Sequence, residues 1–343
     1  MIRYCKLFLC LTIAILLAWQ LPWCYAFLTL KADPVPFTLY SPLAGDFISI
    51  GMRDGGKGLQ RFDTQGHTYT QQQTDSLLPW FYVRQLTADE RFPDSICGVA
   101  VSPKEIQLSN FTFRSIPADL NKPELGLYFL LESASGRVDL QMPSDVFRIT
   151  NKGMEFVDME HNALEKEKGL LFTEALKQQG FAFPARRIAG NPGTKKEYDG
   201  GYLLIDSHNR MFRLRMMEGR PRVDEIPMPK DVVPMYAFVT ENRDRRTIGY
   251  FTDTRHHFYV INADRSVVKS GIPSVDPARA SITIFGNMFA WTVKVDTPHD
   301  VYLYALDANN YSLIREHAFK DVYPTVEGLT FTSPDDKFVK PRF

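Results

Sequence analysis

The stretch from Gly200 to Arg215, "GGYLLIDSHNRMFRLR", places one acid between two apolar runs. Tyr202–Ile205 and the alternating residues after Phe212 have the composition of β-strands, and the residues between them have the composition of a turn. A short carboxylate at the start of a turn accepts hydrogen bonds from backbone N–H groups two residues further on. The stretch therefore predicts a β-hairpin in which Asp206 is a turn acid and not a catalytic acid.

Two later segments repeat this layout, "IGYFTDTRHHFYVI" around Asp253 and "WTVKVDTPHDVYLYAL" around Asp296. The three acids are 47 and 43 residues apart. Similar segments surround Asp63 and Asp158, and "LTFTSPDDKFVKP" near the C-terminus has the same strand, turn, strand form. A catalytic acid has no reason to recur in every repeat, so all five acids are predicted to be structural turn acids.

A period in the forties is typical of the four-stranded blades of a propeller. We therefore expect a mainly β fold with a propeller-like body of about five or six degenerate four-stranded blades and inserted helices. A β-sandwich-like α+β fold is the alternative. Helix signals lie within residues 70–86, 102–110 and 165–180, where Ser102 and Pro103 form an N-cap and first-turn pair and Gly180 ends the last helix.

A loop of about twenty residues, "FAFPARRIAGNPGTKKEYDGG" (181–201), separates the last helix from the first clear repeat. Loops of this length usually have a function or are disordered. The loop is the candidate partner-binding segment, and the alternative is a solvated loop whose charges maintain solubility. Its four cations are Arg186, Arg187, Lys195 and Lys196.

The N-terminus predicts a membrane anchor. Arg3 and Lys6 precede an uncharged stretch from Leu7 to Leu30, whose 24 residues make a helix of roughly 36 Å, enough to cross a bilayer core of ~30 Å. We expect residues 1–6 in the cytoplasm, residues 7–30 in the membrane, and an extracytoplasmic β-rich domain over residues 31–343. The alternative is a signal peptide cleaved after Ala26, which also places the body outside the cytoplasm.

Composition and residue types argue against several chemistries. The 40 basic and 40 acidic residues give no net charge, so no nucleic-acid partner is expected. Only Cys97 lies beyond the N-terminal segment, and we expect it to be a small buried residue. No metal, cofactor or catalytic residue is predicted. Histidines after the turn acids favour turn polarity over a shared metal site on one rim, and adjacent His256 and His257 are expected on opposite faces of a strand.

Several segments resemble an uncharacterised family, a domain of unknown function found in membrane-anchored proteins of gut-type anaerobic Gram-negative bacteria. They are "PFTLYSPLAGDF", "FDTQGHTYT", "DSLLPWFYVRQL", "GLYFLLESASGRVDLQMPSDVFRIT", "EKGLLFTEAL", "AGNPGTKKEYDGGYLLID" and "IFGNMFAWTVKV". The resemblance extends from the anchor to about Phe319. It implies a single-pass inner-membrane protein with a periplasmic body, encoded beside genes for ABC-type transporters. It assigns no reaction and no catalytic residue.

Two functions remain open from the sequence. The expected one is a non-enzymatic, inner-membrane-anchored periplasmic accessory or scaffold module, with the inner membrane and the permease subunits of an ABC-type transporter as candidate partners. The alternative is an extracytoplasmic hydrolase or lyase that acts on an envelope glycan, lipid or peptide in a central channel of the body.

Overall fold

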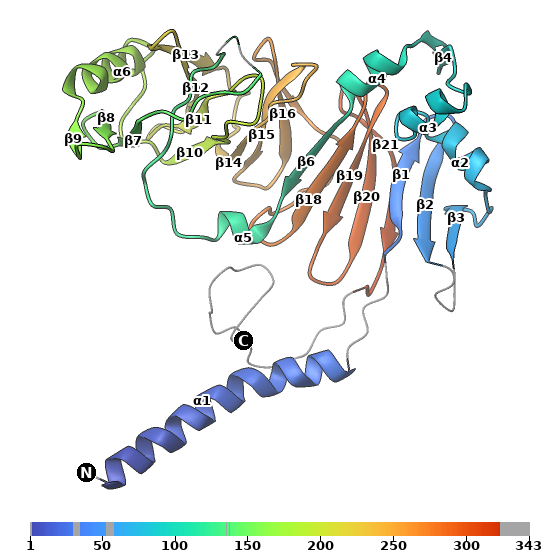
Figure 1. Cartoon of the computed structure of the whole chain (residues 1–343), viewed down its shortest axis with the longest axis horizontal. Helices are drawn as coiled ribbons and strands as arrows, with labels where there is room; N and C mark the ends of the chain where they lie inside the picture. Colours follow the sequence, from blue (N-terminus) through green and yellow to red (C-terminus); the bar gives the residue numbers. More distant parts are fainter. Residues whose placement is uncertain (1, 30–34, 53–57, 135, 137, 323–343) are drawn as a thin grey trace.

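The computed structural model describes residues 2–29, 35–52, 58–134, 136 and 138–322. Helix α1 (Ile2–Thr29) lies apart from the folded body (Figure 1). Its segment Arg3–Leu21 has a mean hydropathy of 1.8 and no part of it is buried. By length and composition, α1 is long and apolar enough to cross a membrane, which fits a membrane anchor and a signal peptide alike. Leu30, the expected end of the span, lies outside the described residues.

Two small antiparallel sheets form the ends of the body (Figure 1). In each of them every strand pairs with the next one along the chain. The first sheet contains β1 (Phe37–Ser41), β2 (Asp46–Met52) and β3 (Leu59–Asp63). The sheet at the opposite end contains β7 (Asp145–Ile149), β8 (Met154–Asp158) and β9 (Ala163–Leu164).

Two four-stranded sheets follow in the chain, each an antiparallel meander. The first contains β10 (Arg187–Gly190), β11 (Tyr202–Ile205), β12 (Met211–Met217) and β13 (Arg220–Ile226). The second contains β14 (Pro234–Val239), β15 (Thr247–Asp253), β16 (Phe258–Asn262) and β17 (Val267–Lys269). These two sheets have the strand number that the sequence repeat predicts.

The fifth sheet joins distant parts of the chain. Its meander contains β18 (Ser281–Gly286), β19 (Ala290–Asp296), β20 (Val301–Asp307) and β21 (Leu313–Phe319). Strand β6 (Phe111–Ser115) adds to its edge by pairing with β18, so that Arg114 lies opposite Thr283. This long-range pairing connects the N-terminal part of the body to its last sheet.

The sheets bury their faces against one another in a row. One apolar cluster joins β7–β8 to β11–β12, a second joins β11–β13 to β14–β16, and a third joins β15–β16 to β18–β20. A fourth joins β1–β2 to β19–β20. The mainly β, propeller-like architecture expected from the sequence is thereby confirmed, because successive meanders pack as neighbouring blades do.

Helices replace strands at the two ends of the row. Helix α6 (Lys166–Gln178) packs Phe172 and Leu176 against the sheet β7–β9. Helices α2 (Gln71–Leu77), α3 (Val83–Ala88) and α4 (Pro103–Ser109) cover the sheet β1–β3. These two helix-covered end sheets have three strands each. A short helix, α5 (Pro117–Leu120), follows β6.

The helix boundaries follow their capping residues. Ser102 and Thr70 cap α4 and α2, each in a reciprocal capping box with the side chain three residues on. The expected helical region 70–86 divides into α2 and α3, because Leu78 precedes Pro79 and leaves helical geometry at φ −125°. Gly180, at φ +81°, ends α6 as predicted.

The prediction that Cys97 is buried is wrong. Cys97 is exposed in the turn between β4 (Ser95–Ile96) and β5 (Val99–Ala100). Cys97 and Gly98 both have positive φ, 50° and 78°, which is the backbone of a two-residue type I′ hairpin turn. Hairpin geometry therefore determines the position of this residue, and its apolar character does not.

Candidate functional site

Three of the predicted turn acids have one geometry. The Oδ1 atom of Asp206 accepts hydrogen bonds from the backbone N–H groups of His208 (2.9 Å) and Arg210 (2.8 Å). Asp63 and Asp253 bind the N–H groups two and four residues on in the same way. The residue three positions after each acid has positive φ, and these residues are Gly66, Asn209 and His256.

The second carboxylate oxygen of each of these acids is also engaged. Oδ2 of Asp206, which is fully buried, accepts from the Ala182 N–H (3.1 Å) and from the Arg210 guanidinium. In the other two turns, Oδ2 lies within hydrogen-bond distance of a histidine Nδ1 and accepts from a tyrosine hydroxyl. Burial raises the pKa of Asp63, but hydrogen bonds from His67, Tyr69 and the backbone outweigh it and lower that pKa to about 2.

The turns at Asp158 and Asp296 differ from this geometry. Asp158 binds the N–H groups of the second and third residues after it. Asp296 instead forms an ion pair with Lys294 at 2.8 Å. The residue two positions after Asp296 is Pro298, which has no N–H to donate. Asn262 begins a similar five-residue turn that closes at Ser266, although the repeat of acids did not predict it.

The adjacent histidines do not lie on opposite faces of a strand, as the sequence predicted. Both lie in the turn between β15 and β16, because the turn spans the residues from Asp253 to His257. His257 Nδ1 lies 3.1 Å from Asp253, and His256 has the positive φ of the turn. Within the described residues, no three His, Cys, Asp or Glu side chains form a group able to hold a metal ion.

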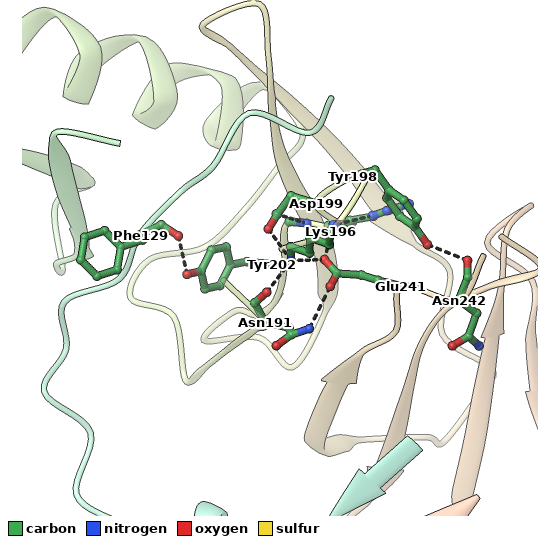
Figure 2. A network of polar contacts seen from close by, with 11 residues as sticks. Phe129, Asn191, Lys196, Tyr198, Asp199, Tyr202, Glu241 and Asn242 are labelled. Carbon is green, nitrogen blue, oxygen red and sulfur yellow. Dashed lines mark hydrogen bonds and ion pairs between the residues drawn. The ribbon is translucent and has the colours of Figure 1, made fainter. Parts of the chain in front are cut away.

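The basic loop is partly a strand. Arg187–Gly190 forms β10, which pairs with β11 and has Arg187 opposite Ile205. The prediction that residues 181–201 form a loop throughout therefore fails at this edge strand. The remaining part, residues 191–201, folds onto the hairpin between β14 and β15 (Figure 2).

Glu241, just after β14, anchors this folded loop. Its carboxylate accepts hydrogen bonds from Asn191 Nδ2 (2.8 Å), Lys196 Nζ (2.6 Å) and the Gly200 N–H (2.6 Å), as Figure 2 shows in part. Lys196 also forms an ion pair with Asp199 at 2.8 Å, and only 15% of the Lys196 side chain is exposed. Burial raises the pKa of Asp199, and the neighbouring Lys196 opposes that rise.

Two tyrosines, Tyr198 of the loop and Tyr202 at the start of β11, attach this region to its neighbours (Figure 2). The hydroxyl of Tyr202 donates to the Phe129 carbonyl (2.6 Å), and the hydroxyl of Tyr198 donates to the Asn242 carbonyl (2.9 Å). Burial raises the pKa of Tyr198 to about 12, so its hydroxyl keeps its proton and remains a donor. The loop therefore has a defined conformation that buried polar contacts hold in place.

This loop forms one wall of a large groove, with a cavity volume of about 1100 Å³. The other walls come from β14, from β6 and from the segment between α5 and Tyr128. Arg187 lies over the Tyr236 ring at 5.0 Å and forms an ion pair with Glu124 at 3.3 Å. Tyr128 donates to the other oxygen of Glu124 at 3.0 Å. The groove thus lies where three sheets meet.

The structure brings three of the four predicted loop cations to this groove, namely Arg187, Lys195 and Lys196. Arg186 is exposed and outside the groove lining. Sequence reasoning missed Arg114, Lys122, Glu124 and Glu241. The apolar and polar alternation of "FTFRS" was a signal that Arg114 points away from a core, but nothing local indicated that β6 lies beside β18.

Residues 37–306 match the family described as Domain of unknown function (DUF4857). The match covers most of the sequence, so the chain belongs to this family. No curated protein matches the chain.

Solved structures with some similarity include the Dos1 propeller, with 10% identity, a TM-score of 0.30, and coverage of 84% of this chain and 63% of that one. Apo AztD from Citrobacter koseri has 12% identity and a TM-score of 0.30, with 84% and 72% covered. PorZ, a surface component of the type-IX secretion system of Porphyromonas gingivalis, has 10% identity and a TM-score of 0.25, with 85% and 28% covered. The chain thus spans less than two thirds of the Dos1 propeller, and these likenesses carry no information on function.

Proposed function

We propose that this member of the DUF4857 family is a non-enzymatic, membrane-anchored scaffold module that holds a partner protein in its groove. The observation that carries the proposal is the groove of about 1100 Å³ between β6, β10 and β14, with a wall fixed by Glu241 and Lys196. This volume is at or above the upper end of ordinary small-molecule sites. A segment of another protein fits such a groove better than a small substrate does.

The carboxylates of the groove support binding over catalysis. Glu241 accepts from three donors, and Glu124 is held between Arg187 and Tyr128. A general acid or base has to exchange protons with a substrate. Glu241 and Glu124 are two of the three carboxylates that line the groove, and the third, Asp119, also has a partner. Since the carboxylates already interact with protein groups, the geometry favours the scaffold over the alternative of a hydrolase or lyase.

Helix α1 supports a membrane setting for this module. Its side chains from Leu7 to Leu21 are almost all exposed and none is charged, so a lipid bilayer provides the apolar surroundings that the body does not. Arg3 and Lys6 lie in the first turns of α1, ahead of its apolar stretch, and this order of charges orients the body outward. In this proposal the body lies in the periplasm, and its partner is a permease subunit of an ABC-type transporter in the inner membrane.

The proposal is tested by photo-crosslinking in intact cells. A benzophenone amino acid replaces Thr112, an exposed residue of β6 that lines the groove, in the full chain. The matched control position is Arg220 on β13, which is also exposed but lies at the opposite edge of the sheet from β10. We expect a discrete adduct with a transporter membrane subunit from position 112 only. Equal adducts at both positions, or none at position 112, would contradict the proposal.

A further inference from the structure

We infer that the groove takes an extended acidic segment of its protein partner. The inference rests on the proposed function, because it names the chemistry of the partner at the same groove. Two independent features of the groove carry it. One is the charge of the side chains that line it, and the other is the free backbone edge of the strands that form it.

The lining carries a surplus of positive charge. Five cations and three carboxylates line the groove, in a chain whose total charge is zero. Lys196 is offset by Glu241 and Asp199, and Arg187 by Glu124. The groove therefore has a net surplus of positive charge, which attracts ligands of the opposite sign.

Three of the lining cations form no hydrogen bond or ion pair among the described residues. They are Arg114, Lys122 and Lys195, and all three are exposed. Two adjacent lysines of the loop differ: Lys196 is mostly buried and forms ion pairs, whereas Lys195 is exposed and lines the groove. The planar guanidinium of Arg114 is able to donate two parallel hydrogen bonds to a carboxylate of a partner.

The strands that form the groove have free edges. Strands β6, β10 and β14 are each the outermost strand of their sheet, so one side of each backbone has no strand partner among the described residues. An extended peptide uses such edges for main-chain hydrogen bonds. Tyr128 and Tyr236 add aromatic surface on the same lining. An acidic, extended segment would neutralise the positive charge of the lining and form main-chain hydrogen bonds with the edge strands.

The test is a charge reversal combined with the crosslinker at position 112. Arg114→Glu with Lys195→Glu removes two of the three cations without a described partner, and Arg220→Glu with Lys230→Glu makes the same change of charge at exposed sites outside the groove. Because none of these four side chains has a described partner, the melting temperature should stay unchanged in both variants. We expect the groove variant to lower the adduct yield about tenfold or more and the control variant to leave it unchanged.

The crosslinked peptide, identified by mass spectrometry, is expected to lie in an Asp- or Glu-rich segment of the partner. An adduct that persists in the groove variant, or one that maps to a segment without acids, would overturn the inference while leaving the scaffold function intact. Loss of the adduct on adding inorganic pyrophosphate, but not on adding a soluble glutamate-rich peptide, would show phosphate recognition and also overturn it. Failure to form any adduct would overturn both proposals.

Discussion

The carboxylate of Asp206 is fully buried and accepts five hydrogen bonds, from three backbone N–H groups and two nitrogens of the Arg210 guanidinium. One of the backbone donors, Ala182, belongs to the segment that leads to β10. The acid therefore fixes its own turn and also the start of the groove wall. Asp206 has a structural role in its own turn, and through Ala182 it also helps to position the segment that leads to β10.

Asp206→Ala removes one partner of a buried, hydrogen-bonded charge and leaves three N–H groups without an acceptor. We expect a loss of about 3 kcal/mol or more in the free energy of unfolding. Asp296→Ala is the matched control, because the ion pair of that acid with Lys294 is partly exposed and its loss should cost less than about 1 kcal/mol. Urea unfolding of the full chain in detergent, followed by tryptophan fluorescence, compares them. Similar losses in the two variants would contradict this interpretation.

At the residue scale, the backbone hydrogen bonds of a turn acid require residues after it that can donate. Asp63, Asp206 and Asp253 have free N–H groups at the second and fourth positions, whereas Pro298 denies this to Asp296. Pro298 is present in the sequence, but the prediction used only the spacing of the acids and did not consider which later residues can donate. Cys97 was mispredicted because a type I′ turn requires positive φ there, and composition alone does not reveal it.

At the element scale, the groove depends on a close approach between the basic loop and β12. Gly201 has φ +77°, and a Cβ on it would lie 2.1 Å from the Leu214 carbonyl oxygen. Only glycine fits this position without strain. The loop that contains Lys195 and Lys196 is therefore held at its C-terminal end by a backbone contact, in addition to the hydrogen bonds to Glu241.

Gly201→Ala is expected to lower the free energy of unfolding by about 2 kcal/mol or more, since the clash is with backbone and the φ is positive. Gly193→Ala, in the same loop, should be neutral within about 0.5 kcal/mol, because a Cβ there meets nothing within 4 Å. Thermal unfolding of both variants measures the difference. An equally stable Gly201→Ala protein would show that this approach does not position the loop.

The helix ends were predictable from the sequence because the residues that cap or end a helix lie next to it in the chain. The caps at Ser102 and Thr70 and the stop at Gly180 lie within a few residues of the helices that they delimit. The addition of β6 to β18 was not predictable, because the pairing connects residues far apart in the chain and depends on how the sheets pack. The groove was missed for the same reason, since its walls come from three separate sheets.

At the scale of the whole molecule, the chain combines an apolar helix at one end with a row of stacked sheets (Figure 1). The period in the forties predicted propeller-like blades, and the apolar clusters between neighbouring sheets agree with that prediction. The strand number varies, because the two helix-covered end sheets have three strands and β6 adds a fifth strand to the sheet of β18–β21. Function in this account needs both parts, since the anchor holds the groove beside its membrane partner.

The most direct measurement of this account is the state of the N-terminus in native membranes. The membrane fraction is washed with alkaline carbonate, and the intact mass of the purified protein is determined. We predict that the chain stays in the pellet and retains α1, because its uncharged residues from Leu7 to Thr29 are long enough to span the bilayer. A chain that is released by the wash and begins at Phe27 would show a cleaved signal peptide and contradict the anchored scaffold.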